Sequence, residues 1–328
     1  MLPVIDFAEL DTPAGRERLR EITHHVGFFY LDGHGVDREL LDRVFTVARE
    51  FFALPEDSKQ SIAMLNSPHF RGYNRVGGEL TNGETDWREQ IDIGPERQPI
   101  PDADGYLRLQ GPNQWPADLP DLEKTIEALD AALTDVGMRL LRHWAASLDA
   151  DPAIFDDAFA HAPRHADQGR PLPGTAERRP HRRAGRRRPQ GFGCTDVAAP
   201  RTRLVGTPGR DRGRRLDRRT GPRRLVRGQH RRTARVATGG YLRATRHRVL
   251  TPAGAPERLS VPYFLNPALD ATVPTIELPP HLAERARGIE LDPANPLYRT
   301  YGENAWKSRT RAHPDVYARW YPGEAEPE

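Results

Sequence analysis

The central segment of this chain, residues 163–235, constrains its fold more than any other part. The segment contains 23 Arg, no Lys and five acidic residues, which gives it a local charge of +18. The remainder of the 328-residue chain carries a charge of −15, so the net charge of +3 comes entirely from this segment. Ahead of it and behind it, the sequence is typical of an ordinary acidic enzyme.

The same segment is poor in the residues that form a core. Only eight of its 73 residues are Val, Ile, Leu, Met, Phe, Trp or Tyr, and they follow neither a helical nor a strand period. Burial of so little apolar surface does not offset the entropy lost on ordering the chain. We therefore expect an aberrant, poorly packed segment where a regular fold would have its central strands.

Composition favours a cytoplasmic protein. Cys194 is the single cysteine, so no internal disulfide can form. No apolar run approaches the roughly 20 residues that span a bilayer. The first residues, Met1 to Asp6, show no basic stretch followed by an apolar one, so we expect no signal peptide.

The N-terminal third alternates strand and helix patterns. Residues 3–7 and 27–31 are short apolar runs typical of strands, and residues 14–25 form a predicted helix between them. Residues 37–52 carry apolar side chains at three- and four-residue spacing, which predicts an amphipathic helix that Leu54-Pro55 ends. Residues 64–100 are expected to be rich in loops.

A longer helix is predicted over residues 119–148. One apolar stripe recurs there at alternating steps of four and three residues: Leu122, Ile126, Leu129, Leu133, Val136, Leu140 and Trp144. Beyond residue 235 the pattern predicts strands at 241–242, 247–250 and 259–265, then helices near 304–311 and 315–320.

Several motifs outside the central segment resemble the isopenicillin N synthase-like family of non-haem iron oxygenases, most of which use 2-oxoglutarate. They occur in the family's order over roughly 1–162 and 236–321. The matching stretches are Pro3-Val4-Ile5-Asp6, Gly27-Phe28-Phe29-Tyr30, Gly33-His34-Gly35, Phe51-Phe52-Ala53-Leu54-Pro55, Phe70-Arg71-Gly72-Tyr73, Asp86-Trp87-Arg88-Glu89, His247-Arg248-Val249 and Arg258-Leu259-Ser260.

The resemblance implies a fold and a site. The fold would be mainly β, a double-stranded β-helix (jelly roll) with an N-terminal helical region. His247 would be the distal iron ligand, and Arg258 and Ser260 would hold the carboxylate of 2-oxoglutarate. A guanidinium is a fixed fork for a carboxylate, and residues two apart on a strand face the same side. The enzyme would use Fe(II), 2-oxoglutarate and O₂ to oxidise a small organic molecule.

Other histidines and aromatic residues are expected to have structural roles. His34 and His69 are expected to be structural, and His24-His25 to end a helix. Tyr73 and Trp87 are expected in the core or a pocket wall. The chain then divides into an N-terminal dioxygenase region (1–118), a long helix leading into the core (119–162), the aberrant segment (163–235), and a C-terminal part of the dioxygenase domain with its tail (236–328).

The two remaining iron ligands of the family, a His-x-Asp pair, are not found where they are expected. His165-Ala166-Asp167 is a literal match, but Gln168-Gly169 follows it in place of an apolar strand, and it lies too far from His247. Each residue of the segment can be written as its possible codons and the reading frame moved one nucleotide forward. In that frame the codons of Pro189-Gln190-Gly191 can encode His-Lys-Asp. Residues 192–200 and 225–235 then become compatible with apolar strands of the family.

We interpret the central segment as a compensated frameshift. The printed chain then has Pro189 and Gly191 at the ligand positions, and we expect little or no oxygenase activity from it. Two alternatives stay open. One is an iron oxidase that does not use 2-oxoglutarate, as isopenicillin N synthase does not. The other is a nucleic-acid-binding protein on an inactive oxygenase scaffold, disfavoured because the Arg-rich segment has one aromatic residue, Phe192, for base stacking.

Overall fold

The computed structural model describes residues 2–81, 84–85, 88–160, 174–179, 195–198, 226–229, 232–243, 258–289 and 296–323. His165, Asp167, Pro189, Gly191 and His247 lie outside these ranges. Predictions that concern them therefore stay predictions.

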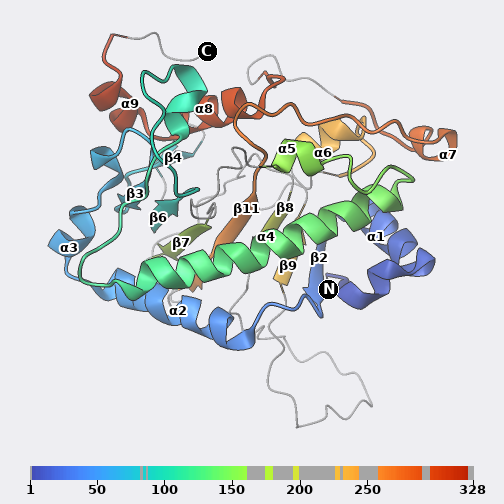
Figure 1. The fold of residues 1–328 in the computed structure, drawn as a ribbon, viewed down its shortest axis with the longest axis horizontal. Helices are drawn as coiled ribbons and strands as arrows, with labels where there is room; N and C mark the ends of the chain where they lie inside the picture. The colour runs from blue at the N-terminus through green and yellow to red at the C-terminus, as the bar shows by residue number, and fades with distance from the viewer. Residues whose placement is uncertain are drawn as a thin grey trace.

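A mostly antiparallel sheet forms the centre of the described structure (Figure 1). Its strands run in the order β1-β2-β9-β8-β11-β7-β6-β3, and β10 pairs with β7 outside this path. Only the pair β1 and β2 is parallel among these described ladders. The strand bounds are β1 Val4–Asp6, β2 Phe28–Asp32, β3 Gly72–Asn74, β6 Glu89–Ile93, β7 Gly174–Arg179, β8 Thr195–Ala198, β9 Val226–Gln229, β10 Arg258–Ser260 and β11 Pro262–Leu265. A separate hairpin pairs β4 (Leu80–Thr81) with β5 (Glu84–Thr85).

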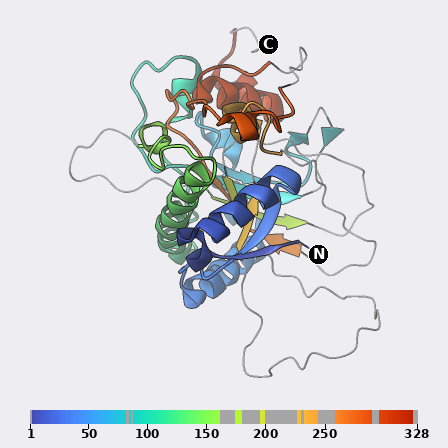
Figure 2. The same ribbon diagram turned by 90° about the vertical axis from the view of Figure 1, so that its right-hand side faces the viewer.

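Helices cover one side of this sheet and one end of the molecule (Figures 1 and 2). The long helix α4 crosses the sheet and packs against α1, α2 and β11. The helix bounds are α1 Pro13–His25, α2 Arg38–Ala53, α3 Glu56–Gln60, α4 Asp121–Ser147, α5 Asp156–Phe159, α6 Arg232–Ala237, α7 Pro280–Ala283, α8 Tyr301–Ala312 and α9 Pro314–Trp320. Short 3-10 turns are η1 Phe7–Asp11, η2 Met64–Asn66 and η3 Gly105–Leu109.

The predicted helices form where their caps and apolar stripes require. Thr12 precedes α1, and its hydroxyl accepts a hydrogen bond from Gly15 N at 3.0 Å. The Asp37 carboxylate likewise accepts from Glu39 N at 2.8 Å at the start of α2. All seven residues of the predicted stripe on α4 are buried. Each stabilises the fold by roughly 1.5–3 kcal/mol, so α4 is the main packing surface of the helical layer.

Residues 64–100 are rich in loops, as predicted, and also contain the short strands β3 and β6. All three residues of β3 are buried, because β3 pairs with β6 at one edge of the sheet. Tyr241 and Leu242, expected in a strand, follow the turn after α6, where both are buried and Leu242 N donates to Thr238 Oγ1 at 3.2 Å.

Part of the Arg-rich segment contributes backbone to the sheet. β7, β8 and β9 lie within it, and β8 pairs with both β9 and β11. Residues 195–198 and 226–229 fall inside 192–200 and 225–235, the stretches in which the shifted reading frame permits apolar strands. That the segment packs poorly stays a prediction.

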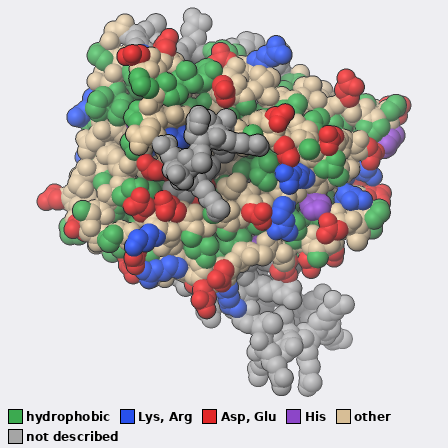
Figure 3. Space-filling view, viewed as in Figure 1, with side chains coloured by type: hydrophobic (Ala, Val, Ile, Leu, Met, Phe, Trp, Pro, Cys, Tyr) green, Lys and Arg blue, Asp and Glu red, His purple; other side chains and the backbone are tan. Residues whose placement is uncertain are grey.

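The surface of the described part carries mixed charge on the face seen in Figure 3, where acidic and basic side chains are interspersed. No helix within the described ranges combines the length and the apolar character needed to cross a membrane.

Candidate functional site

The strands β10 and β11 carry the C-terminal motif into the sheet. Arg258 begins β10 opposite Arg179 of β7, and Ser260 ends it opposite Glu177. Burial then alternates along the chain: Val261, Tyr263 and Leu265 are buried, whereas Ser260 and Phe264 are half-buried. The buried face packs on α4, where the hydroxyls of Tyr263 and Thr134 lie 2.7 Å apart. Ser260 and Phe264 therefore belong to the face of the sheet turned away from α4.

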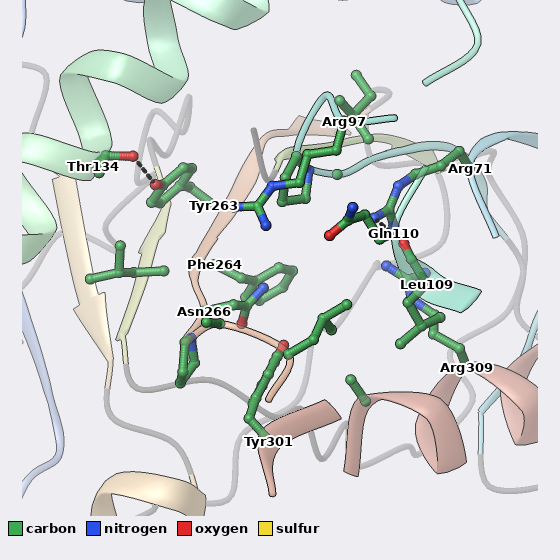
Figure 4. A pocket seen from close by; sticks show the side chains of 18 residues that line it. Arg71, Arg97, Leu109, Gln110, Thr134, Tyr263, Phe264, Asn266, Tyr301 and Arg309 are labelled. Atoms are coloured by element: carbon green, nitrogen blue, oxygen red, sulfur yellow. Dashed lines mark hydrogen bonds between the residues drawn. The ribbon is translucent and has the colours of Figure 1, made fainter. Parts of the chain in front are cut away.

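A cavity of about 120 Å³ opens where β11 ends (Figure 4). Its walls come from the end of β6, the loop after β11, η3 and helix α8. The lining includes apolar residues such as Ile93, Leu109, Phe264 and Leu269, together with polar ones: Arg71, Arg97, Gln110, Asn266, Tyr301 and Arg309. Among the described residues, three arginines and no acidic residue line it. The cavity is therefore a positively charged space with partly apolar walls.

Unusual backbone geometry delivers Arg71 to this cavity. The preceding Phe70 is fully buried with φ of +56°, and the following Gly72 has φ of +115°. A side chain at residue 72 would collide with Ile62 O at 2.3 Å, so glycine is required there. Gln114 fixes the stretch, because its Nε2 donates to Arg71 O at 2.7 Å. Such strained positions gather at functional sites.

The Arg71 guanidinium is deeply buried and incompletely satisfied. Its Nη2 donates to Leu109 O at 3.1 Å, while its Nε has no hydrogen-bond partner among the described residues. Burial, together with the nearby Arg309 charge, lowers the pKa of Arg71 to about 10. Arg71 therefore stays a cation at neutral pH.

Arg309 differs from Arg71 because it has a carboxylate partner. Its Nη1 lies 3.1 Å from Asp92 Oδ2, and the same oxygen accepts from Gln90 Nε2 at 2.9 Å. Arg97 is half-buried in the loop after β6, and the carboxylate of Asp270 acts on it electrostatically. Burial lowers the pKa of Arg97 as well.

A buried histidine lies beside this charge cluster. His313, between α8 and α9, is fully buried, and neither ring nitrogen has a hydrogen-bond partner among the described residues. Glu79 Oε1 lies 4.0 Å from its Nε2. Burial lowers the pKa of His313 to about 4, so its ring is neutral at pH 7.

The described residues alone do not form an iron centre. Within the described ranges no three His, Cys, Asp or Glu side chains are placed to hold a metal ion. His247 lies outside those ranges, and Arg258 is described there only as part of a strand. Ser260 lies on the face of the sheet turned away from α4, and the predicted ligand set stays a prediction.

The histidines assigned to structure are held by backbone atoms. His24 Nδ1 lies 2.7 Å from Tyr241 O, and His69 Nδ1 lies 2.7 Å from Arg108 O. His34 Nδ1 accepts from Val36 N at 3.1 Å. Tyr73 is buried in the core as expected, and Trp87 lies outside the described residues.

Sequence reasoning missed the arginines of the cavity. Arg71 stands in a quoted motif, Phe70-Arg71-Gly72-Tyr73, but that motif was used only as a family signature. Arg97 and Arg309 lie far apart in sequence and carry no spacing signal. Only the fold brings the three together.

Comparison with known proteins shows what the chain is similar to. The model of the family described as the non-haem dioxygenase in morphine synthesis N-terminal region matches residues 2–118. The 2-oxoglutarate-dependent dioxygenase frbJ of Dothideomycetidae sp. (strain 11243) is 28% identical, over 97% of this chain and 91% of that protein. The chain is thus similar to a 2-oxoglutarate-dependent dioxygenase along nearly its whole length.

Other relatives match over about half of their length. Homoarginine-6-hydroxylase 2-ODD-C23.1 of Arabidopsis thaliana is 32% identical over 49% of this chain, and the match spans only 53% of that relative. The similarity to these relatives therefore covers only about half of each protein and does not identify a substrate for this chain.

Solved structures of the dioxygenases share the fold. JOX2 in complex with 2OG, Fe and JA has a TM-score of 0.66 at 20% identity, covering 98% of this chain and 89% of JOX2. A full-length Neurospora crassa protein in complex with alpha-KG and thymine also has a TM-score of 0.66, at 19% identity, covering 94% of this chain and 96% of that protein. The chain thus shares its overall fold with these two proteins, of which one was solved with 2OG and Fe and the other with alpha-KG.

Proposed function

We propose that this chain is a dioxygenase scaffold in which Arg258 and Ser260 bind the carboxylate of 2-oxoglutarate and His247 is one iron ligand. The reaction of the intact family site would oxidise a small organic molecule with O₂. The observation that carries the proposal is the course of β10 and β11. The Arg-x-Ser motif forms β10, which pairs antiparallel with β7, and Phe264 of the cavity wall follows Ser260 by four residues.

We also propose that this chain does not catalyse the oxygenase reaction. The family needs two imidazoles and one carboxylate on one side of the iron. The sequence offers Pro189 and Gly191 at the positions of the missing pair. The start of β8 at Thr195, shortly after Gly191, supports this placement, because the family's His-x-Asp pair precedes a strand.

The chain regions follow from the same proposal. Residues 1–118 and 119–162 form the N-terminal region and the long helix. Residues 163–235 replace the native sequence of the central strands, and residues 236–328 complete the dioxygenase domain. The relatives and neighbours include enzymes named for homoarginine hydroxylation and a complex with thymine, which agrees with a small organic substrate.

Release of succinate tests this proposal. The printed chain is incubated with Fe(II), ascorbate and 2-oxoglutarate, and succinate is measured beside a His247→Ala control. We expect no succinate above that control. Succinate that is formed by the printed chain and lost in the control would show a working iron site, with His165 and Asp167 as the next ligands to test.

A further inference from the structure

The cavity at the end of β11 carries an excess of positive charge. Arg71 and Arg97 both line it, and Asp270, the carboxylate that acts on Arg97, is not among the described residues of the lining. The carboxylates that act on Arg71 are already engaged: Asp92 binds Arg309 and Gln90, while Glu96 Oε2 accepts from Asn113 Nδ2 at 2.7 Å. A buried cation without its own counter-ion costs several kcal/mol. A bound anion would remove that cost.

The structure holds Arg71 in place for such a ligand. Its side chain is buried, its backbone oxygen is held by Gln114, and its Nε–H has no acceptor among the described residues. A guanidinium with a donor to spare is suited to a carboxylate. In Figure 4 the side chains of Arg71, Arg97 and Arg309 reach into the cavity, and Asn266 and Tyr301 lie across from them.

The rest of the cavity indicates the body of the ligand. Ile93, Leu109, Phe264 and Leu269 supply apolar walls. The Asn266 amide oxygen is buried without a hydrogen-bond partner among the described residues, so it can accept from a ligand N–H or O–H. A cavity of about 120 Å³ holds roughly eight to twelve water-sized spheres, which is room for a small organic molecule.

The cavity is separate from the Arg-x-Ser motif. Phe264, at the cavity wall, follows Ser260 by four residues along the strand direction, which corresponds to roughly 13 Å. Ser260 is not among the described residues that line the cavity. One dicarboxylate gripped at the Arg-x-Ser motif therefore leaves the cavity arginines for a second molecule.

We propose that this cavity binds the carboxylate of a small, partly apolar organic acid through Arg71 and Arg97, and that this acid is the substrate class of the enzyme. That the bound acid is a substrate rests on the proposed function. That the cavity binds an organic acid does not depend on it. Arg309, already paired with Asp92, adds to the positive potential. A ligand with a cationic end is repelled.

Three probes of the same shape test the charge preference. They are 3-phenylpropanoate, its neutral amide and 3-phenylpropylamine, titrated into the printed chain by calorimetry at low salt. We expect the carboxylate to bind at least tenfold more tightly than the amide, and the amine to bind least. Equal affinity for acid and amide, or no binding of the acid, overturns the proposal.

Variants then locate the site. Arg97→Gln, in a half-buried loop, should reduce the preference for the acid to within twofold. Arg139→Gln on the outer face of α4 is the matched control and should leave the preference unchanged. Arg71→Gln should likewise reduce the preference for the acid to within twofold. Because the Arg71 side chain is buried, the melting temperature of this variant is measured to confirm that it folds. A preference that survives Arg97→Gln contradicts the proposal.

Titration of 2-oxoglutarate separates this inference from the proposed function. Binding of 2-oxoglutarate should be lost in Arg258→Ala and kept in Arg97→Gln, with the reverse for 3-phenylpropanoate. If Arg258→Ala removes both ligands, the acid binds at the Arg-x-Ser motif and the cavity proposal is wrong. If Arg97→Gln removes 2-oxoglutarate and Arg258→Ala does not, the cavity holds the co-substrate, and the proposed roles of Arg258 and Ser260 fail.

Discussion

The Arg71 guanidinium lies directly against the backbone of Gly94, where a Cβ atom would stand 2.0 Å from Arg71 Cζ. Gly94 is itself fixed, since its N–H donates to Asn113 Oδ1 at 2.8 Å and its carbonyl accepts from Asn113 Nδ2 at 3.0 Å. Neither partner can move away easily. The absence of a side chain at residue 94 is therefore what leaves room for the buried cation.

Gly94→Ala should destabilise the protein by about 1–3 kcal/mol, the usual cost of overpacking a buried site. Urea denaturation measures the change in the free energy of unfolding. In an Arg71→Met background, where the guanidinium is gone, the same substitution should cost much less. A cost of Gly94→Ala that is equal in both backgrounds would show that the two residues are not coupled.

The buried His313 predicts a loss of stability in mild acid. Burial lowers its pKa to about 4 in the folded state, whereas an unfolded histidine titrates near 6.5. Between these values the unfolded chain binds the extra proton, so the free energy of unfolding falls as the pH drops from about 6.5 towards 4. The full shift corresponds to about 3 kcal/mol.

Melting curves of His313→Phe between pH 4.5 and 7.5 check this prediction. The variant should lose much of the pH dependence of the parent protein. His281→Gln on the exposed α7 is the control and should keep it. A parent protein whose melting temperature is flat over this range would contradict the assignment.

The ion pair of Lys59 and Glu89 is a third point to test. Lys59 is buried, its Nζ lies 2.7 Å from Glu89 Oε1, and the same oxygen accepts from Tyr73 Oη at 2.6 Å. Glu56 Oε2 also lies 3.0 Å from Lys59 Nζ, so Glu89→Ala removes one of two carboxylate partners and should cost about 1.5–3 kcal/mol by thermal or urea unfolding. The double variant Lys59→Met, Glu89→Leu should cost less than Glu89→Ala alone. A larger cost for the double variant would mean that the pair stabilises the fold beyond its own desolvation.

A gene edited to read one nucleotide forward across residues 163–235 should encode an iron-binding protein. The shifted frame supplies His-Lys-Asp and an apolar strand after it, and β8 lies where that strand is expected. Metal analysis after Fe(II) loading under anaerobic conditions should give about one iron per chain. Addition of 2-oxoglutarate should then produce a weak visible charge-transfer band. An edited protein that neither folds nor binds iron would refute the frameshift interpretation.

Arg258→Ala in that edited protein should weaken 2-oxoglutarate binding by thirty- to a hundredfold. The expected loss corresponds to about 2–3 kcal/mol for a charge-assisted bidentate contact. Titration of the charge-transfer band measures it, with Arg139→Gln as the control. Iron binding that is indifferent to 2-oxoglutarate and to Arg258 would favour the oxidase that works without 2-oxoglutarate.

The helical half of the fold was predictable because its signals are local. The stripe of α4 and the caps of α1 and α2 depend on residues within one or two turns, and the structure confirms all three helices. The strands β3 and β6 were missed because each is short and buried on both faces, so neither shows the alternation that marks a half-buried strand.

The candidate site was predictable only where a motif is contiguous. Arg258 and Ser260 are two residues apart and could be recognised together. The cavity arginines come from three separate regions of the chain, and their meeting depends on the turn at Phe70 and on α8 packing against η3. Non-local juxtaposition of this kind leaves no trace in spacing or composition.

The position of α4 in the chain has a consequence for synthesis. The ribosome completes α1, α2 and α4 before the first residue of the Arg-rich segment is made, and these three helices already bury one another's apolar faces. Domains begin to fold from the N-terminus as they emerge. The nascent chain therefore already contains the helical layer on which the later strands pack. A change of reading frame in the central codons alters the strands that pack on this helical layer. It leaves the sequence of α1, α2 and α4 unchanged.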